Sequence, residues 1–322
     1  MNLNAQKKIR PPLDTVGFAT NNWQMDSIVK MIHHTYGRLF DDLERNKTVK
    51  ESDTFKIAIC PHDDYAYAGY LYEIVLPHVK AKNVILIGVA HKAKKFNIES
   101  TMVFDSFDAW KEPYGDVKIS PLRNLILDKL PKSSCIVHDS LHLAEHSLEA
   151  LVPFLQYYNE RVQIVPVLIP YMSFEQMEKY AMQFASVINQ VMKENNMKWG
   201  KDVAIVISND AVHYGDQDWG GKNYAEFGCD SAGYKLAFNK EKELVNMILP
   251  KYPDTAQIHK FFNNLVKPGD WREYQWPWCG RYSVPFGLLT GLYLTDIYKD
   301  ESLIGTELAY STSIENPPLN LS

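Results

Sequence analysis

The chain has 322 residues, 46% of them hydrophobic, and a formal net charge of −5 at neutral pH. This length can bury a large core, and the acidic balance excludes nucleic-acid binding through a broad Lys/Arg surface. No stretch approaches the roughly 18 consecutive apolar residues of a membrane span, and no apolar segment follows the charged N-terminus, so we expect a soluble, cytoplasmic protein. The four cysteines lack CxxC spacing, which indicates neither a zinc knuckle nor a dense disulfide framework.

Continuous apolar runs rich in Val and Ile predict buried parallel strands, and segments with helical spacing lie between them. The predicted strands are 55–60, 83–89, 162–169 and 203–208, with a final strand at 307–313. The predicted helices are 67–80, 122–130, 148–158, 174–195, 241–251, 255–266 and 284–298. Strand and helix in alternation imply βαβ units with right-handed crossovers.

No internal repeat or low-complexity linker is visible, so we expect one three-layer α/β/α domain over residues 1–322, with a mostly parallel central sheet. Residues 1–54 are expected to form a helical segment that packs on this core. Glycines and aromatic residues crowd the first part of 215–278, and helical patterns follow. We expect a loop and helix insertion near the site there, with a surface excursion as the alternative.

Two histidines directly follow predicted strands: His62 in FKIAICPH and His91 in NVILIGVAH. Ligands of open parallel sheets bind in the crevice outside the carboxyl ends of the strands. Taken singly, either residue could instead be a structural histidine or a helix cap. A third histidine, His213, lies just past the strand 203–208, and the three together predict a multi-histidine site.

Asp210 and His213 lie three residues apart in SNDAVHYG. If one helical turn forms there, both side chains share a face, which suits a carboxylate that orients an imidazole, or an acid/base pair. In the alternative interpretation Asp210 caps a turn and His213 packs beside Tyr214.

His146 lies at the entry of a predicted helix, in LAEHSLEALVPFLQ. Helix capping by Ser147 and the first-turn acid Glu149 explains part of this segment, and only the histidine needs another explanation. His138 and His142 lie in a predicted loop and receive no role.

Cys279 lies between an aromatic loop and a predicted helix, in WPWCGRYS. Arg281 and the helix N-terminus would favour its thiolate, the form that nucleophiles and soft-metal ligands require. A small buried hydrophobe is the alternative. Cys60 ends an apolar strand one position out of register with His62, and we assign it to the core.

Read in order, PHDDYAYAG, GVAH, EPYG, EHSLEALVPFLQ, IVPVLI, SNDAVHYG and CGR resemble the Memo family, whose prokaryotic members are called AmmeMemoRadiSam system protein B. That family is similar in fold to the class III extradiol dioxygenases, the protocatechuate-type ring-cleaving enzymes. The resemblance extends from about residue 55 to the last predicted strand.

The resemblance implies a metal site of two histidines and a cysteine, which fall here on His62, His91 and Cys279. It also implies pocket residues with catalytic roles, which fall on Asp210, His213 and His146. Iron is the first expected cofactor, with copper or zinc as alternatives. The expected partners are an unidentified small-molecule substrate, an AMMECR-type protein and a radical SAM enzyme.

The chain departs from the family pattern beside the first ligand, since Asp63 and Asp64 in PHDDY stand where PHAGY is common. We interpret the chain as a metal-dependent redox enzyme in which His213 acts as acid/base and Asp210 orients it or a bound water. One alternative is a binding module without turnover, since animal members of the family are associated with signalling. Another is a metal-free hydrolase that uses Cys279, His213 and Asp210.

Overall fold

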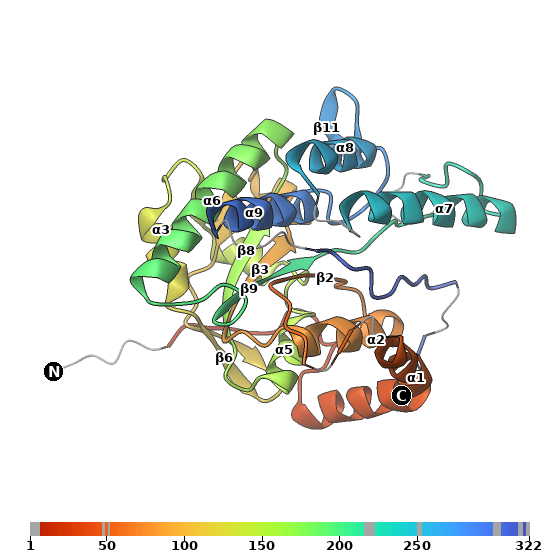
Figure 1. Cartoon of the computed structure of the whole chain (residues 1–322), viewed down its shortest axis with the longest axis horizontal. Helices are drawn as coiled ribbons and strands as arrows, with labels where there is room; N and C mark the ends of the chain where they lie inside the picture. Colours follow the sequence, from red (N-terminus) through yellow and green to blue (C-terminus); the bar gives the residue numbers. More distant parts are fainter. Residues whose placement is uncertain are drawn as a thin grey trace.

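A mixed, mostly parallel sheet lies at the centre of the protein, with helices on both of its faces, as the computed structural model in Figure 1 shows. The structure describes residues 7–46, 49–50, 52–215, 223–249, 253–298, 304–314 and 318–319. The strand order is β1-β5-β6-β8-β3-β9-β2. Outside this order, β4 pairs with both β8 and β7. The neighbours β8, β3, β9 and β2 all run parallel, which confirms the predicted α/β class.

The strands are β1 (Ile9–Arg10), β2 (Ile57–Cys60), β3 (Asn83–Val89), β4 (Met102–Phe104), β5 (Ala109–Glu112), β6 (Gly115–Ile119), β7 (Cys135–Val137), β8 (Gln163–Ile169), β9 (Val203–Ser208), β10 (Val266–Lys267) and β11 (Asp270–Tyr274). The α-helices are α1 (Asn22–Arg45), α2 (Tyr65–Val75), α3 (Leu122–Lys129), α4 (Asp139–Leu143), α5 (Val152–Tyr158), α6 (Phe174–Glu194), α7 (Ser231–Ile248), α8 (Thr255–Leu265) and α9 (Ser283–Tyr298). Two 3-10 turns, η1 (Leu76–His78) and η2 (Ala93–Phe96), follow α2 and β3.

Alternate side chains of the central strands enter different apolar clusters. In β3, Ile85 and Ile87 pack with residues of α6, α8 and α9, whereas Val84 and Leu86 pack with residues of α1, α2 and α5. Because side chains along a strand point to opposite faces, both faces of this sheet are buried. The three-layer prediction is therefore confirmed. Cys60 is 1% exposed and belongs to the core, as predicted.

Helix α9 contacts α6, α8 and the strands β3, β8 and β9. Its side chains are apolar on several faces, which fits a helix that lies between other helices and the sheet. This packing fixes the start of α9, and with it the loop that carries Cys279. Within the described part of the chain, no helix is both long enough and apolar enough to cross a lipid bilayer.

Several predicted elements differ from the structure. The predicted final strand is wrong, because residues 304–312 have no regular secondary structure. Helix α7 begins at Ser231, ten residues before the predicted start, because the Asp230 side chain accepts a hydrogen bond from the Gly233 amide (2.7 Å) and caps it. Strands β10 and β11 form a hairpin, and β11 takes up the first residues of the predicted aromatic loop WREYQWPWCGRYS, so that the loop begins only after Tyr274.

Candidate metal centre

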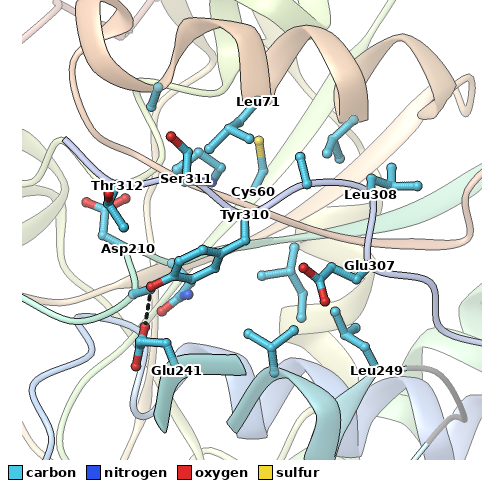
Figure 2. Close-up of a pocket in the computed structure, with 18 of the residues that line it drawn as sticks. Cys60, Leu71, Asp210, Glu241, Leu249, Glu307, Leu308, Tyr310, Ser311 and Thr312 are labelled. Carbon is cyan, nitrogen blue, oxygen red and sulfur yellow. Dashed lines mark hydrogen bonds between the residues drawn. The ribbon is translucent and has the colours of Figure 1, made fainter. Parts of the chain in front are cut away.

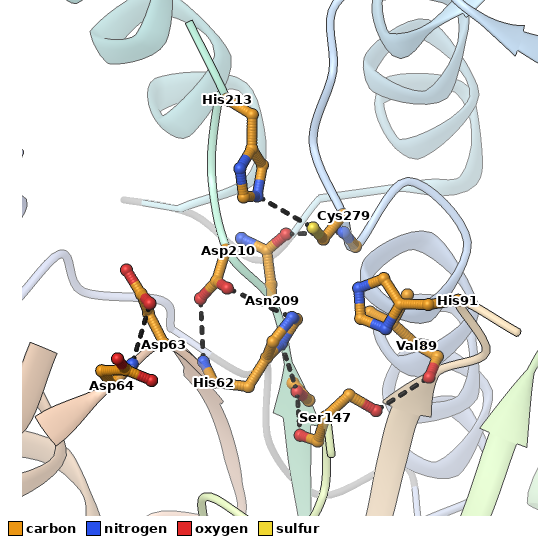
Figure 3. Close-up of polar contacts among 12 residues, drawn as sticks. His62, Asp63, Asp64, Val89, His91, Ser147, Asn209, Asp210, His213 and Cys279 are labelled. Carbon is orange, nitrogen blue, oxygen red and sulfur yellow. Dashed lines mark hydrogen bonds and ion pairs between the residues drawn. The ribbon is translucent and has the colours of Figure 1, made fainter. Parts of the chain in front are cut away.

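The carboxyl ends of three neighbouring strands supply most of the candidate site. His62, His91 and Asp210 each lie two residues past a strand, namely β2, β3 and β9. The sheet order β3-β9-β2 therefore brings together side chains that are distant in sequence (Figure 3). A cavity of about 290 Å³ at this edge is lined by Asp14, Phe18, His62, Asp63, Asp64, His91, Lys92, His146, Asp210, His213 and Cys279. All six residues predicted for the site line this cavity.

The tautomer of His62 is set by a chain of buried hydrogen bonds. Ser208 Oγ donates to the Ser147 carbonyl (2.5 Å) and lies 2.8 Å from His62 Nδ1. A hydroxyl has one proton to donate, so Ser208 must accept from Nδ1–H. The neutral ring then presents a bare Nε2. Burial, followed by the charges of His91, His146 and His213, holds the pKa of His62 well below its usual value, which favours that neutral ring.

His91 is oriented by a buried carboxylate. Its Nδ1 lies 3.0 Å from Glu145 Oε2, and the side chain of Glu145 is 2% exposed. The other oxygen of this carboxylate accepts a hydrogen bond from the Lys92 amide. A carboxylate that holds one ring nitrogen of a histidine leaves the other for a metal, an arrangement common at metal sites. We expect Nε2 of His91 to be the nitrogen that faces the cavity.

Cys279 completes two groups of candidate ligand atoms. Its sulfur and one ring nitrogen each of His62 and His91 lie within 4.8 Å of one another, and so do the ligand atoms of Cys279, Asp210 and His213. Burial, followed by the charge of Asp210, raises the pKa of the Cys279 thiol well above its usual value, against the weaker opposing effect of Arg281. Arg281 therefore favours the thiolate, as expected, but burial outweighs it and the thiol is the favoured form in the metal-free protein.

Asp210 lies against His62. Its Oδ1 accepts a hydrogen bond from the His62 amide (2.8 Å), and its Oδ2 lies 3.1 Å from His62 Nε2. Burial raises the pKa of Asp210 to about 7. A protonated Asp210 can donate a hydrogen bond from Oδ2 to the bare Nε2 of His62. Without that proton, a lone pair of the carboxylate would face the lone pair of the ring nitrogen.

His213 pairs with the cysteine. Its Nε2 lies 2.9 Å from Cys279 Sγ, and burial, followed by the charge of His91, lowers its pKa to about 4. The helical turn expected for SNDAVHYG is wrong: Val212 forms an antiparallel bridge with Trp278, and the segment is extended. Asp210 and His213 nevertheless reach the same cavity.

His146 stacks on His91, with ring centroids 5.1 Å apart and ring planes at 12°. Burial, followed by the charge of His91, lowers the pKa of His146. The capping interpretation of its neighbours is wrong. Ser147 Oγ donates to the Val89 carbonyl (2.8 Å), and Glu149 forms a salt bridge with Arg10 (2.7 Å), while α5 begins only at residue 152.

Asp63 and Asp64 both line the cavity. Asp64 has φ −49°, an ordinary conformation, so the aspartate in place of the family's glycine causes no backbone strain here. Its side chain makes no hydrogen bond that caps α2, and burial, followed by the charges of Asp63 and Asp14, raises its pKa. Asp64 therefore precedes α2 without capping it through its side chain.

Sequence reasoning missed Glu145 and Ser208, which hold the two imidazoles, and Asp14, Phe18 and Lys92, which line the cavity. Glu145 directly precedes His146, so its place in the motif was a usable signal. Ser208 was hidden at the end of an apolar strand, where nothing in the sequence marks its partner. The unassigned His142 is buried, and its Nε2 lies 3.1 Å from the Val103 carbonyl.

The fold and this cavity together define an α/β protein with a histidine- and cysteine-lined site at the carboxyl edge of a parallel sheet. The family model described as Memo-like protein matches residues 33–284. The chain therefore belongs to the Memo-like protein family.

Curated relatives named MEMO1 family protein are similar to about half of the chain. The relative from Aquifex aeolicus is 34% identical over 168 residues, which cover 51% of this chain and 57% of the relative. The relative from Sulfurisphaera tokodaii is 30% identical over 162 residues (48% and 52%), and that from Methanothermobacter thermautotrophicus is 29% identical over 170 residues (51% and 56%). The match thus spans little more than half the length of these relatives.

Proposed function

We propose that the protein binds one metal ion through His62 Nε2, His91 Nε2 and Cys279 Sγ, and that it is a metal-dependent redox enzyme. The observation that carries this proposal is the engagement of both Nδ1 atoms, by Ser208 and by Glu145, beside a thiol whose sulfur lies within 4.8 Å of a nitrogen of each ring. Metal-binding histidines commonly hold a hydrogen bond at one ring nitrogen and offer the lone pair of the other. At His62 that lone pair faces Asp210 Oδ2 (3.1 Å), and a bound metal would replace this contact.

The donor set fits a transition-metal ion. An ion held at about 2.0–2.3 Å from nitrogen and sulfur donors needs them within roughly 4.5 Å of one another, close to the spacing here. Iron is the first candidate on the relation to extradiol dioxygenases, while two imidazoles and a thiolate also suit copper and zinc. With three protein ligands the bound ion would keep open positions, where it would supply Lewis-acid or redox chemistry.

The other cavity residues would bind the substrate and move protons. Asp210 has a pKa of about 7, so it can hold or release a proton near neutral pH, and a bound cation would shift it toward the carboxylate. His213, with a pKa of about 4, is neutral at pH 7 and can accept a proton or orient a substrate group. His146 would form the wall beside His91, where its stacked ring limits how a substrate can approach.

The first test is elemental analysis of protein purified anaerobically. We expect about one metal ion per chain. Alanine at His62, His91 or Cys279 should remove most of the metal, because a site with three protein ligands has none to spare. His138→Ala is the matched control, since His138 caps α4 and lies outside the cavity lining. Full occupancy in any of the three ligand variants would remove that residue from the site.

Oxygen uptake with a reductant and the loaded protein then separates a redox enzyme from a binding module. A loaded protein without uptake under any reductant would favour the binding module. An AMMECR-type protein, a radical SAM enzyme and a small-molecule substrate remain our proposed partners, carried by family membership alone.

A second candidate is a metal-free hydrolase, favoured by the 2.9 Å contact between Cys279 Sγ and His213 Nε2. Proton transfer from the Cys279 thiol to His213, which would form the nucleophilic thiolate, is disfavoured, because the pKa of Cys279 is raised and that of His213 is lowered to about 4. Mass spectrometry after incubation with an activated ester decides the matter. An acyl group trapped on Cys279 in metal-free protein would favour the hydrolase.

A further inference from the structure

Glu241 of α7 is a buried carboxylate that accepts four hydrogen bonds and lies outside the lining of the metal cavity. Its Oε1 accepts from the indoles of Trp276 and Trp278, the latter at 2.7 Å. Its Oε2 accepts from the Val212 amide and from the Tyr310 hydroxyl, both at 3.1 Å. Four donors from three separate segments of the chain therefore converge on one side chain.

Two of those donors precede the residues that pair at the site. Val212 is followed by His213, and Trp278 is followed by Cys279. Their segments form a short antiparallel pairing, in which the His213 amide donates to the Pro277 carbonyl (3.1 Å) and Val212 bridges Trp278. Glu241 binds both sides of this pairing, and the 2.9 Å contact between Cys279 Sγ and His213 Nε2 lies one residue farther along each side.

The fourth donor comes from the C-terminal segment, residues 304–314. In Figure 1 this segment runs between α7 and α2, and in Figure 2 the Tyr310 hydroxyl reaches Glu241. A salt bridge between Lys242 and Glu307 also ties the segment to α7, and the Lys242 ammonium lies 5.4 Å from the Tyr310 ring centroid.

A cavity of about 1250 Å³ surrounds the C-terminal segment and borders the metal cavity. Asp63, Asp210 and His213 line both cavities, so the two share a wall. The segment lies outside residues 33–284, the part of the chain that matches the family model.

We propose that Glu241 is a positioning residue for the Cys279–His213 pair, and that the C-terminal segment takes part in this positioning through Tyr310. When the Tyr310 hydroxyl donates to Glu241, it helps Glu241 to hold the two paired segments in register. When the C-terminal segment moves away, Glu241 keeps three donors and the Cys279–His213 pair loosens. A ligand or partner that moves this segment would therefore regulate the site. This regulation rests on the proposed metal function, whereas the geometry of the pair can be measured without metal.

A carboxylate is required at this position because every neighbour is a donor. The two oxygens accept two hydrogen bonds each, whereas a glutamine would place an NH₂ group against two of the donors. Glu241→Gln should therefore disturb the pairing although it keeps the shape of the side chain.

The deciding variant is Tyr310→Phe, which removes one hydroxyl and leaves Glu241 in place. The readout is the rate at which iodoacetamide labels Cys279 in metal-free protein at fixed pH, followed by peptide mass spectrometry. We expect labelling roughly tenfold or more faster than in the unaltered chain, the effect of one lost hydrogen bond to a carboxylate. Tyr293→Phe is the matched control, because the Tyr293 hydroxyl donates to Glu178 (2.9 Å) on the helical layer away from the site, and it should leave the rate unchanged.

The buried Cys135, which lines neither cavity, is an internal standard for general loosening of the fold. Faster labelling of Cys279 with Cys135 unchanged supports positioning, whereas an equal increase at both thiols would overturn it as mere destabilisation. An unchanged Cys279 rate in Tyr310→Phe would overturn the proposal, and so would an unchanged rate in Glu241→Gln. These outcomes hold whether or not the protein binds metal.

A second readout separates this proposal from the proposed function. If cobalt(II) binds, its thiolate charge-transfer band should shift or weaken in Tyr310→Phe and stay unchanged in Tyr293→Phe. If cobalt does not bind to the unaltered chain, the proposed metal site fails, and the labelling experiment alone still decides the role of Glu241.

Discussion

Replacement of Ser208 with alanine tests whether a buried hydroxyl selects the metal-binding form of His62. Ser208 is fully buried, and its hydroxyl joins His62 Nδ1 (2.8 Å) to the Ser147 carbonyl (2.5 Å). Without the Ser208 hydroxyl, the tautomer of His62 that carries its proton on Nε2 becomes the more stable one, because Nε2–H can donate to Asp210 Oδ2, 3.1 Å away. The proposed ligand nitrogen of His62 would then carry a proton.

The size of the effect follows from that exchange of tautomers. To bind metal, the variant must give up a hydrogen bond to a carboxylate worth about 1.5–3 kcal/mol. This corresponds to metal affinity weaker by roughly 10–100-fold, the range usual for partners of metal-bound histidines. The assay is a competition titration of zinc or cobalt against a chromophoric chelator, at a pH where the unaltered chain is saturated.

Ser134→Ala is the matched control for this experiment. Ser134 is also fully buried, and its hydroxyl donates to the Pro131 carbonyl (2.7 Å), far from the cavity lining. We expect both variants to lose about 1 kcal/mol of stability, but only Ser208→Ala to lose metal affinity. Equal affinities in the two variants would refute the tautomer argument, whatever their stabilities.

Three further predictions concern the charges around the site. Metal binding should release more than one proton at pH 7, because the raised pKa of Cys279 keeps the thiol protonated until it binds and Asp210, with a pKa of about 7, is still partly protonated; affinity should then rise at least tenfold per pH unit near neutral pH, and calorimetry that finds no proton release would contradict this. Glu145→Gln should weaken metal binding roughly tenfold or more, since it removes the charge beside His91 Nδ1; the same chelator titration checks this, and an unchanged affinity would show that orientation needs no carboxylate. Replacing Asp63 with Ala and Asp64 with Gly should weaken divalent-metal binding and strengthen catechol binding at low salt, and titrations unchanged at two ionic strengths would show that these charges do not act on the cavity.

The sequence predicted those parts of the fold that depend on composition over several residues. Continuous Val and Ile runs located β3 and β9 to the residue, since a strand buried on both faces allows little else. The positions of His62 and His91 followed from the same runs. A sheet of parallel strands leaves only one edge where residues after the strands can meet, and both histidines line the cavity at that edge.

The remaining features depend on contacts that no local pattern encodes. The partner of Ser208 lies on another strand, and the hydroxyl looks the same in sequence whether it caps a helix or holds an imidazole. The first turn of α7 contains a glycine, and the local pattern there predicts a loop, because the start of the helix depends on a single hydrogen bond to Asp230. The C-terminal segment has the alternation of a strand, yet Tyr310 is held by Glu241 and its neighbours outside any strand ladder.

The strand order has a consequence for when the site can exist. β2 and β3 leave the ribosome early, yet they are not neighbours in the sheet, because β9 lies between them. Until β9 has been synthesised and has joined the sheet, the strands that precede His62 and His91 have no neighbouring strand in common. Cys279 is synthesised later still. Such distant pairings form slowly and late in folding. If the protein binds metal as proposed, loading would therefore come late in folding, and a chain that ends before Cys279 would lack one of the three proposed ligands.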